Sequence, residues 1–211
     1  MRNNAIDSGS AIWNLWHGCH KLSAGCKHCY VYRGDSKHDI DSTIVVRTKS
    51  FDLPVRKKRN GEYKISSGTT LYTCFSSDFF VEDADQWRTE AWQMIRLRND
   101  LNFMMITKRI DRLHVALPDD WGTGYEHVTI CCTVENQDRA DYRLPIYINA
   151  PIRHKIIICE PLLERIDLQQ YMGSYIEQIV VGGESGSEAR ICNFDWIMEI
   201  RDLCVKNNIS F

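Results

Sequence analysis

The chain has 211 residues, of which 44% are hydrophobic and 26% charged, a composition typical of a folded globular domain rather than a disordered chain. Its formal net charge of −2 excludes a global electrostatic attraction to nucleic acid. No stretch approaches the ~20 apolar residues that cross a bilayer, so we expect no membrane partner.

Apolar runs and amphipathic runs alternate along the chain. The expected strands are residues 11–16, 70–75, 103–107, 128–134, 155–159 and 177–181. The expected helices are residues 83–99, 111–117, 139–147, 167–172 and 194–206. Asp83 is the expected N-cap of the first of these helices and Asn193 that of the last, because both side chains can accept a backbone N–H.

Several of these strands are apolar on both faces, which is typical of parallel sheets covered by helices. Strand–helix alternation repeated about six times predicts an α/β fold, in the form of a partial (βα)6 TIM-like barrel. A doubly wound open sheet is the main alternative. No low-complexity linker interrupts the pattern, so we expect a single domain over residues 1–211.

Polar or charged residues follow each expected strand directly. They are the three cysteines Cys19, Cys26 and Cys29, then Ser76, Ser77 and Asp78, then Lys108 and Arg109, then Glu135, Asn136 and Gln137, then Glu160 and Pro161, and last Gly182, Gly183, Glu184, Ser185 and Gly186. In both candidate folds the active face lies at the carboxyl ends of the strands. The pattern therefore predicts one shared site at that edge.

The three cysteines of the first loop lie within eleven residues, so their thiolates can surround one metal centre. A structural site usually takes four protein ligands, whereas three leave a position open for chemistry. The chain has no second Cys-x2-Cys pair of the kind that completes zinc knuckles. An iron–sulfur cluster with three thiolates and one open iron fits this count better than zinc.

The chain has nine cysteines in all, and the other six are scattered. Most lie in apolar runs, where we expect them to be buried as small hydrophobic side chains. The first ten residues are polar, so we expect no secretory signal. A reducing cytoplasm follows as the expected location.

Two further segments carry recognisable chemistry. Glycines in residues 182–186 let backbone N–H groups approach a polar ligand closely, although the spacing is not that of a Walker or dinucleotide-binding motif. Residues 47–64 carry seven cations and two carboxylates. That segment is either a solvated loop or a surface that faces an anion or nucleic acid.

Short motifs recur along nearly the whole chain. They are Trp13-Asn14-x-Trp16-x-Gly18-Cys19, Ser23-x-Gly25-Cys26-x-x-Cys29-Tyr30, Ser76-Ser77-Asp78-Phe79-Phe80, Thr107-Lys108-Arg109, Thr133-Val134-Glu135-Asn136-Gln137, Glu160-Pro161-Leu162, residues 182–186 with Arg190, and Arg201-Asp202-x-x-Cys204. Together they resemble a phage- and bacteria-borne family of unknown function related to radical S-adenosylmethionine (radical SAM) enzymes.

The resemblance implies a partial barrel of the radical SAM type with a [4Fe–4S] cluster held by Cys19, Cys26 and Cys29. The open iron would chelate S-adenosylmethionine, whose reductive cleavage would yield a 5′-deoxyadenosyl radical that abstracts hydrogen from a substrate. A donor such as flavodoxin or ferredoxin would supply the electron. The substrate is open, with nucleic acid or a nucleotide as one candidate. The enzyme would work in the cytoplasm of a bacterial or phage-infected cell.

The resemblance also suggests roles for other residues, although it singles out none as catalytic. The expected S-adenosylmethionine contacts are His28, Ser76, Asp78, Glu135, Gly182, Gly183 and Glu184. Lys108, Arg109, Glu160 and Arg190 are expected either to contact the substrate or to form supporting salt bridges inside the mouth of the barrel.

Three features differ from the radical SAM pattern. The first cysteine gap is six residues rather than three, so we expect the loop to bulge. The Gly-Gly-Glu motif follows a late strand rather than the second one. Members of the family continue past Phe211 into another strand, so we expect an open sheet edge there.

Two other functions fit the sequence. One is a non-catalytic zinc-binding module for nucleic acid or a protein partner, with His17, His20 or His28 as the fourth ligand. The other is a degenerate barrel that keeps a cluster but has lost the cleavage of S-adenosylmethionine.

Overall fold

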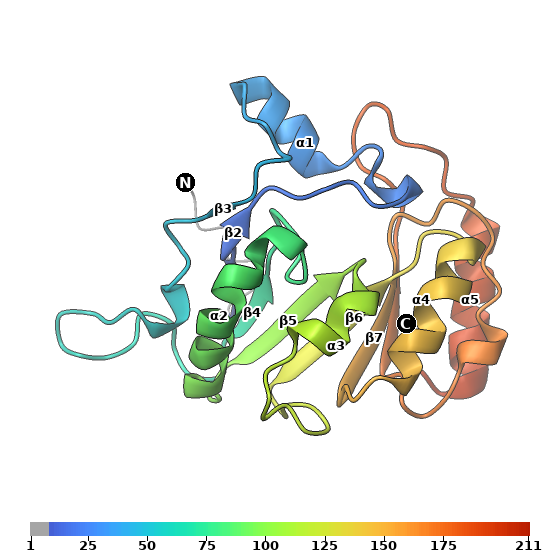
Figure 1. Ribbon diagram of the computed structural model, residues 1–211. Coiled ribbons are helices and arrows are strands. Elements are labelled where there is room, and N and C mark those ends of the chain that lie inside the picture. Colours follow the sequence, from blue (N-terminus) through green and yellow to red (C-terminus); the bar gives the residue numbers. More distant parts are fainter. Residues whose placement is uncertain (1–8) are drawn as a thin grey trace.

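The computed structural model describes residues 9–211, which form a six-stranded parallel sheet flanked by helices (Figure 1). The strands in sheet order are β1 (Ser10–Trp13), β4 (Thr70–Thr73), β5 (Asn102–Thr107), β6 (Val128–Thr133), β7 (His154–Cys159) and β8 (Gln178–Val181). A second, two-stranded antiparallel sheet pairs β2 (Trp16–His17) with β3 (Val46–Arg47). The polar stretch over residues 1–8 lies outside the described part of the chain.

The order of the strands in the large sheet follows the order in the chain, and every neighbouring pair is parallel. A doubly wound sheet reverses its strand order at a switch point, and this sheet has no such reversal. Across residues 9–211, no pairing joins β1 to β8, so the sheet is open there rather than a closed barrel. Ser210 extends the β8 edge through an isolated parallel bridge to Gln178. The predicted α/β class with a parallel sheet is confirmed.

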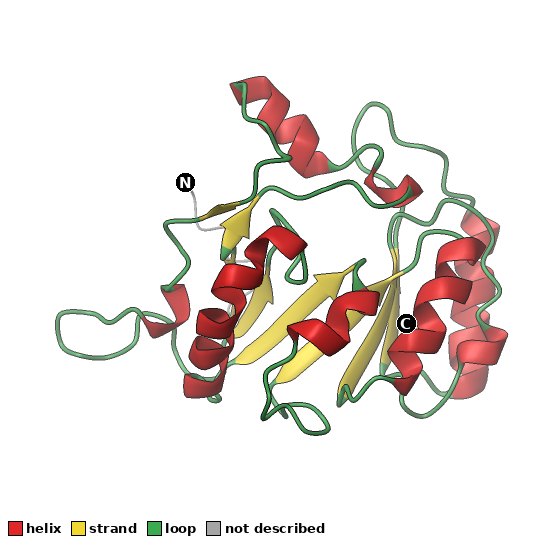
Figure 2. Cartoon of the chain, in the orientation of Figure 1, coloured by secondary structure: helices red, strands yellow, loops and turns green. Residues whose placement is uncertain are grey.

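The longer helices pack along one side of the sheet (Figure 2). They are α2 (Asp85–Leu97), α4 (Gln137–Asn149) and α5 (Phe194–Asn207), with the shorter α1 (Tyr30–Asp35) and α3 (Leu113–Ala116). Single 3₁₀ turns occupy Ala24–Cys26, Ser36–His38, Leu53–Val55, Glu82–Ala84, Ile110–Arg112 and Gln169–Tyr171. None of the helices between residues 9 and 211 has the length and apolar character needed to cross a membrane.

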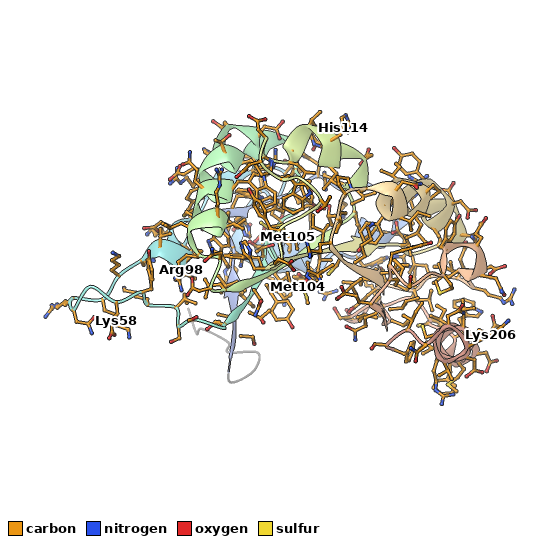
Figure 3. The ribbon with its side chains drawn as sticks, turned by 90° about the horizontal axis from the view of Figure 1, so that it is seen from below. Lys58, Arg98, Met104, Met105, His114 and Lys206 are labelled. Atoms are coloured by element: carbon orange, nitrogen blue, oxygen red, sulfur yellow. The ribbon has the colours of Figure 1, made fainter. Side chains whose placement is uncertain are left out.

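Both faces of β6 and β7 are largely buried, as their continuous apolar runs predict, whereas β5 is buried on one face and half-buried on the other. Met105 packs in the large core beneath the helices, whereas its neighbour Met104 packs on the opposite face of the sheet (Figure 3). The smaller cluster on that second face is built from Cys131, Ile156 and Ile158. Side chains that alternate along a strand therefore fill two separate apolar layers.

Side-chain caps are present at the N-termini of α4 and α5, whereas α1, α2 and α3 have none. Asn193 accepts a hydrogen bond from the N–H of Asp195 at 2.9 Å, so the predicted cap of α5 is confirmed. Asp83 is not the cap of α2, because Glu82–Ala84 forms a 3₁₀ turn and the helix begins only at Asp85. The Asp83 carboxylate instead lies 2.8 Å from the His20 ring.

The N-cap of α4 provides a test of local stability. Asn136 Oδ1 accepts a hydrogen bond from the Arg139 N–H at 2.9 Å, which satisfies one free donor of the first helical turn. We expect Asn136→Ala to lower the free energy of unfolding by about 1 kcal/mol, whereas Asn136→Ser, which keeps an acceptor, loses less. Urea unfolding of the three proteins checks this. Equal stability of the alanine and serine variants would contradict the assignment.

Candidate functional site

Residues 18–29, which we call the cysteine loop, cross the carboxyl edge of the sheet between β2 and α1 (Figure 1). The N–H of Gly18 donates to the Ser76 carbonyl at 3.1 Å, and the N–H of Cys19 donates to the Ser42 carbonyl at 2.8 Å. Gly18 has φ +96°, and a Cβ there would collide with the Ile44 carbonyl oxygen. Only glycine therefore lets the chain enter the loop on this path.

The six-residue gap between Cys19 and Cys26 is taken up by a local turn. Ala24–Cys26 forms a 3₁₀ turn, with the Cys26 N–H donating to the Ser23 carbonyl at 2.9 Å. Cys29 then stands at the N-cap position of α1. All three thiols are half-buried, whereas the core cysteines Cys74, Cys131, Cys132, Cys159 and Cys204 are fully buried. The loop thus bulges as the long spacing predicts, and its thiols remain accessible.

A buried arginine lies against the first thiol. Arg109 Nη1 donates to Cys19 Sγ at 3.4 Å, and Arg109 Nη2 donates to the His20 carbonyl at 2.8 Å. Burial raises the pKa of the Cys19 thiol to about 11, while the Arg109 charge acts in the opposite direction. A cation beside the sulfur favours the thiolate that a metal requires. Arg109 is itself balanced by Asp78, whose Oδ2 lies 3.6 Å from Nη1.

Asp78 is an organising group rather than a free ligand. Its Oδ1 accepts from the Phe80 N–H at 2.9 Å and from the Thr107 hydroxyl at 2.8 Å. Its Oδ2 accepts from the Lys108 N–H at 3.0 Å. These bonds join the segments that follow β4 and β5, and they fix the carboxylate in place beside Arg109.

A second arginine–carboxylate pair lies under the middle of the cysteine loop. Arg143 Nη1 donates to Glu135 Oε2 at 2.7 Å, and the two side chains are 1% and 0% exposed. Arg143 Nη2 also donates to the Ser23 hydroxyl at 3.2 Å. From the other side, the Gly25 N–H donates to Glu135 Oε1 at 3.4 Å. A buried pair of this kind is therefore tied directly to the loop.

A third pair closes the loop from the β8 side. Arg190 donates through Nε to Glu184 Oε2 at 2.9 Å, and through Nη2 to the Ala24 carbonyl at 2.9 Å. Hydrogen bonding from Arg190 lowers the pKa of Glu184 to about 2. In three arginine–carboxylate pairs, whose carboxylates follow β4, β6 and β8, the arginine thus donates a hydrogen bond to the cysteine loop. We call them the loop clamps: Asp78–Arg109, Glu135–Arg143 and Glu184–Arg190.

Most of the residues predicted to contact S-adenosylmethionine have partners within the protein. Asp78, Glu135 and Glu184 belong to the loop clamps. The Ser76 hydroxyl donates to the Trp16 carbonyl at 3.1 Å. The His28 ring lies 3.4 Å from Glu188, which leaves it only 15% exposed. The site therefore uses the predicted carboxylates to hold the loop, and their proposed contacts with the cofactor stay predictions.

The glycines after β8 lie against neighbouring segments. A Cβ on Gly182 would stand 3.0 Å from the Glu160 carboxyl carbon, and one on Gly183 would stand 3.1 Å from the Cβ of Cys192. The Gly182 N–H donates to the Cys159 carbonyl at 3.1 Å, so this position continues the strand pairing. Gly182 thereby brings the β8 backbone close to the Glu160 side chain.

Two of the predicted substrate contacts remain available. Glu160, which follows β7, is exposed, and Lys108, which follows β5, is half-buried. Within the described residues neither side chain forms an ion pair, whereas Arg109 and Arg190 both do. The pKa of Tyr30 is raised, mainly by burial and then by the nearby charges of Cys29 and Glu160. Tyr30, Cys29 and Glu160 therefore lie near one another. The free charges, which follow β5 and β7, therefore alternate with the clamp carboxylates, which follow β4, β6 and β8, around the edge of the sheet.

Two arginines of the site escaped the sequence analysis. Arg143 lies on the same face of α4 as the buried Ala140, Leu144 and Tyr147. A cation at helical spacing among apolar residues is the signal in the sequence that could have identified Arg143 as a buried residue of the site. Arg33 of α1 donates to the Ser185 carbonyl at 2.7 Å, which ties the helix after the cysteines to the glycine segment. No pattern in the sequence indicates that second contact.

The side chains near the cysteine loop bear on which metal the site could hold. In the described part of the chain, no three His, Cys, Asp or Glu side chains converge closely enough to hold a single ion. The three expected alternatives for a fourth zinc ligand each face a carboxylate, with His17 2.8 Å from Asp35. Both the cluster and the zinc alternative therefore stay predictions, carried by the three thiols of the cysteine loop.

Residues 3–211 match the family described as "Protein of unknown function (DUF5131)". The match spans nearly the whole chain, so the chain belongs to that family. No curated protein and no solved structure shows significant similarity to it. The family description assigns no activity and makes no link to radical SAM enzymes.

The buried clamp predicts strong coupling between its two members. We expect Arg143→Met to lower the free energy of unfolding by about 3 kcal/mol, because it leaves the Glu135 charge buried without a partner. The double variant Glu135→Leu/Arg143→Met should lose less than the sum of the single variants. A double-mutant cycle by urea unfolding checks this, with the exposed Arg47–Glu90 pair as a control expected to couple by under about 1 kcal/mol. Additive losses at the buried pair would contradict the clamp.

The third clamp predicts an acid-dependent contribution to stability. The folded pKa of Glu184 is about 2 and its ordinary value is 4.5, so its contribution is complete above the ordinary value and is lost as the pH falls towards 2. The stability difference between the native protein and Glu184→Gln should therefore shrink over that range. Unfolding curves of both proteins at a series of pH values measure it. A difference that does not change with pH would contradict the Glu184–Arg190 pair.

Proposed function

We propose that this DUF5131 protein is a radical-SAM-like enzyme on a partial (βα)6 barrel, in which Cys19, Cys26 and Cys29 hold a [4Fe–4S] cluster. The observation that carries the proposal is a loop with three accessible thiols, fixed by three loop clamps across the carboxyl edge of a parallel sheet. Parallel α/β folds place their active sites at that edge. A three-thiol set also leaves one iron open for a ligand.

The chemistry supplied by the bound cluster and S-adenosylmethionine would be reductive cleavage of the sulfonium to a 5′-deoxyadenosyl radical, with the electron coming from a flavodoxin- or ferredoxin-like donor. The protein's own part is to bind and to orient. The Arg109 N–H beside Cys19 Sγ would stabilise negative charge on that ligand. The indole of Trp16, the first residue of β2, is fully buried and would exclude water from the base of the loop.

The free charges indicate how a ligand would be oriented over the cysteine loop. Lys108 offers an ammonium group suited to the carboxylate of an amino acid moiety or to a phosphate. Glu160 offers a carboxylate that can accept hydrogen bonds from an amine or from ribose hydroxyls. It lies beside Gly182, which has no side chain to block the approach of a ligand. The substrate would be recognised by these two groups, and a nucleotide or nucleic acid has the chemistry to satisfy both.

The test begins with anaerobic purification and analysis of bound metal. We expect about four irons and four sulfides per chain with broad visible absorbance, and loss of all three in Cys26→Ala. Cys192→Ala is the matched control, because Cys192 is also half-buried but lies outside the loop, and it should keep its cluster. One zinc without sulfide would exclude the radical mechanism and support the zinc-binding module.

Incubation of the reduced holoprotein with S-adenosylmethionine forms the second stage. Release of 5′-deoxyadenosine that depends on Cys26 supports the enzyme. A cluster that assembles normally but yields no 5′-deoxyadenosine would identify a degenerate barrel that has lost the cleavage reaction.

A further inference from the structure

A basic hairpin projects from the side of the molecule opposite α4 and α5 (Figure 1). It spans residues 56–64, and an antiparallel bridge between Lys57 and Tyr63 joins its two arms. The Lys58 N–H donates to the Glu62 carbonyl at 2.7 Å, and the turn is completed at Gly61, which has φ +87°. The segment is therefore a short two-stranded ribbon rather than an irregular loop.

Charge is distributed unevenly between this region and the rest of the chain. Residues 47–64 carry seven cations and two carboxylates, a net charge of +5, while the remaining residues carry 19 cations and 26 carboxylates, a net charge of −7. The two local carboxylates pair with Arg56 and Lys58. In the described part of the chain, Lys49, Lys57, Arg59 and Lys64 have no carboxylate partner. Three of these cations, Lys57, Arg59 and Lys64, are thus free on a small projection of an acidic protein.

The base of the hairpin is rigidly held. Arg98, which is 1% exposed, donates to the Ile65 carbonyl at 2.9 Å and also to the Pro54 carbonyl. Its guanidinium stacks on the Tyr63 ring with Cζ 4.0 Å from the ring centroid. Figure 3 shows Arg98 at the base of the hairpin and Lys58 far out at its tip. A solvated loop needs no such anchor, whereas a binding element gains affinity from being held in place before it binds.

We propose that the basic hairpin binds duplex DNA by inserting into the major groove and contacting phosphates. The major groove of B-form DNA admits a two-stranded ribbon, whereas the deep, narrow major groove of A-form RNA does not. The tip residues between Lys57 and Glu62 include no apolar side chain, so the hairpin lacks the element that inserts into a membrane interface. This proposal does not rest on the iron–sulfur cluster.

The segment that leads into the hairpin begins at the small sheet that also opens the cysteine loop. Trp16 of β2 pairs with Arg47 of β3, and the N–H of Thr48 donates to the Leu15 carbonyl at 2.9 Å. The same short sheet therefore supports the candidate metal site at one end and the basic segment at the other. A DNA duplex held by the hairpin would be fixed in orientation relative to the cysteine loop.

The experiment measures binding of the full chain to a short labelled DNA duplex by fluorescence anisotropy over a range of salt concentrations. The variant Lys57→Ala/Arg59→Ala/Lys64→Ala should bind about a hundredfold more weakly near 0.1 M salt, with a log–log salt slope shallower by about 3, because each phosphate contact releases about one counterion. These side chains are exposed, so the melting temperature should stay within about 2 °C of the native value.

The control variant Lys37→Ala/Arg201→Ala/Lys206→Ala removes the same formal charge from exposed positions elsewhere, with Lys206 on the far side of the molecule in Figure 3. It should change the slope by less than about 1. The cluster-free Cys26→Ala variant should bind DNA as the native protein does, so this proposal and the proposed function can fail separately.

Four results would overturn the proposal. They are no binding of duplex DNA by the native chain, an equal loss in the control variant, equally tight binding of duplex RNA, and hairpin-dependent binding of anionic lipid vesicles in place of DNA.

Discussion

Arginine–carboxylate pairs beneath the cysteine loop are the constraint on which the site depends. An arginine that pairs with one carboxylate keeps further N–H donors for other acceptors. In each loop clamp one of these acceptors is an atom of the cysteine loop: the His20 carbonyl, the Ser23 hydroxyl or the Ala24 carbonyl. Two of the three pairs are buried, so moving the loop would break hydrogen bonds of buried charged groups.

The parallel sheet makes this arrangement possible. Because the strands pair in chain order, every segment that follows a strand emerges at the same edge. Carboxylates after β4, β6 and β8 form the loop clamps, and the free charges Lys108 and Glu160 follow β5 and β7, which lie between them. The segment after β5 supplies both the clamp residue Arg109 and the free Lys108, so residues that fix the loop and residues with free charge lie side by side at this edge.

Much of the fold could be predicted from the sequence. Apolar runs located all six strands of the large sheet, and the Asn193 cap located α5, because both signals are local and act within a few residues. Asp83 was misassigned as a cap because a 3₁₀ turn intervenes and His20, 63 positions away in the chain, supplies another partner. Sequence located the carboxylates of the site but not their partners, since the Glu135–Arg143 pairing depends on how α4 packs on β6. The roles of Asp78, Glu135 and Glu184 in holding the loop therefore required the structure.

The central claim is that the three fixed thiols hold a cluster with one iron open to S-adenosylmethionine. Electron paramagnetic resonance of the anaerobic, reduced protein, recorded before and after addition of S-adenosylmethionine, tests it most directly. The account predicts a reduced [4Fe–4S] spectrum whose g-values shift when S-adenosylmethionine is added, because the added ligand enters the coordination shell of one iron. A spectrum that does not change on addition, or the absence of any cluster signal, would contradict it.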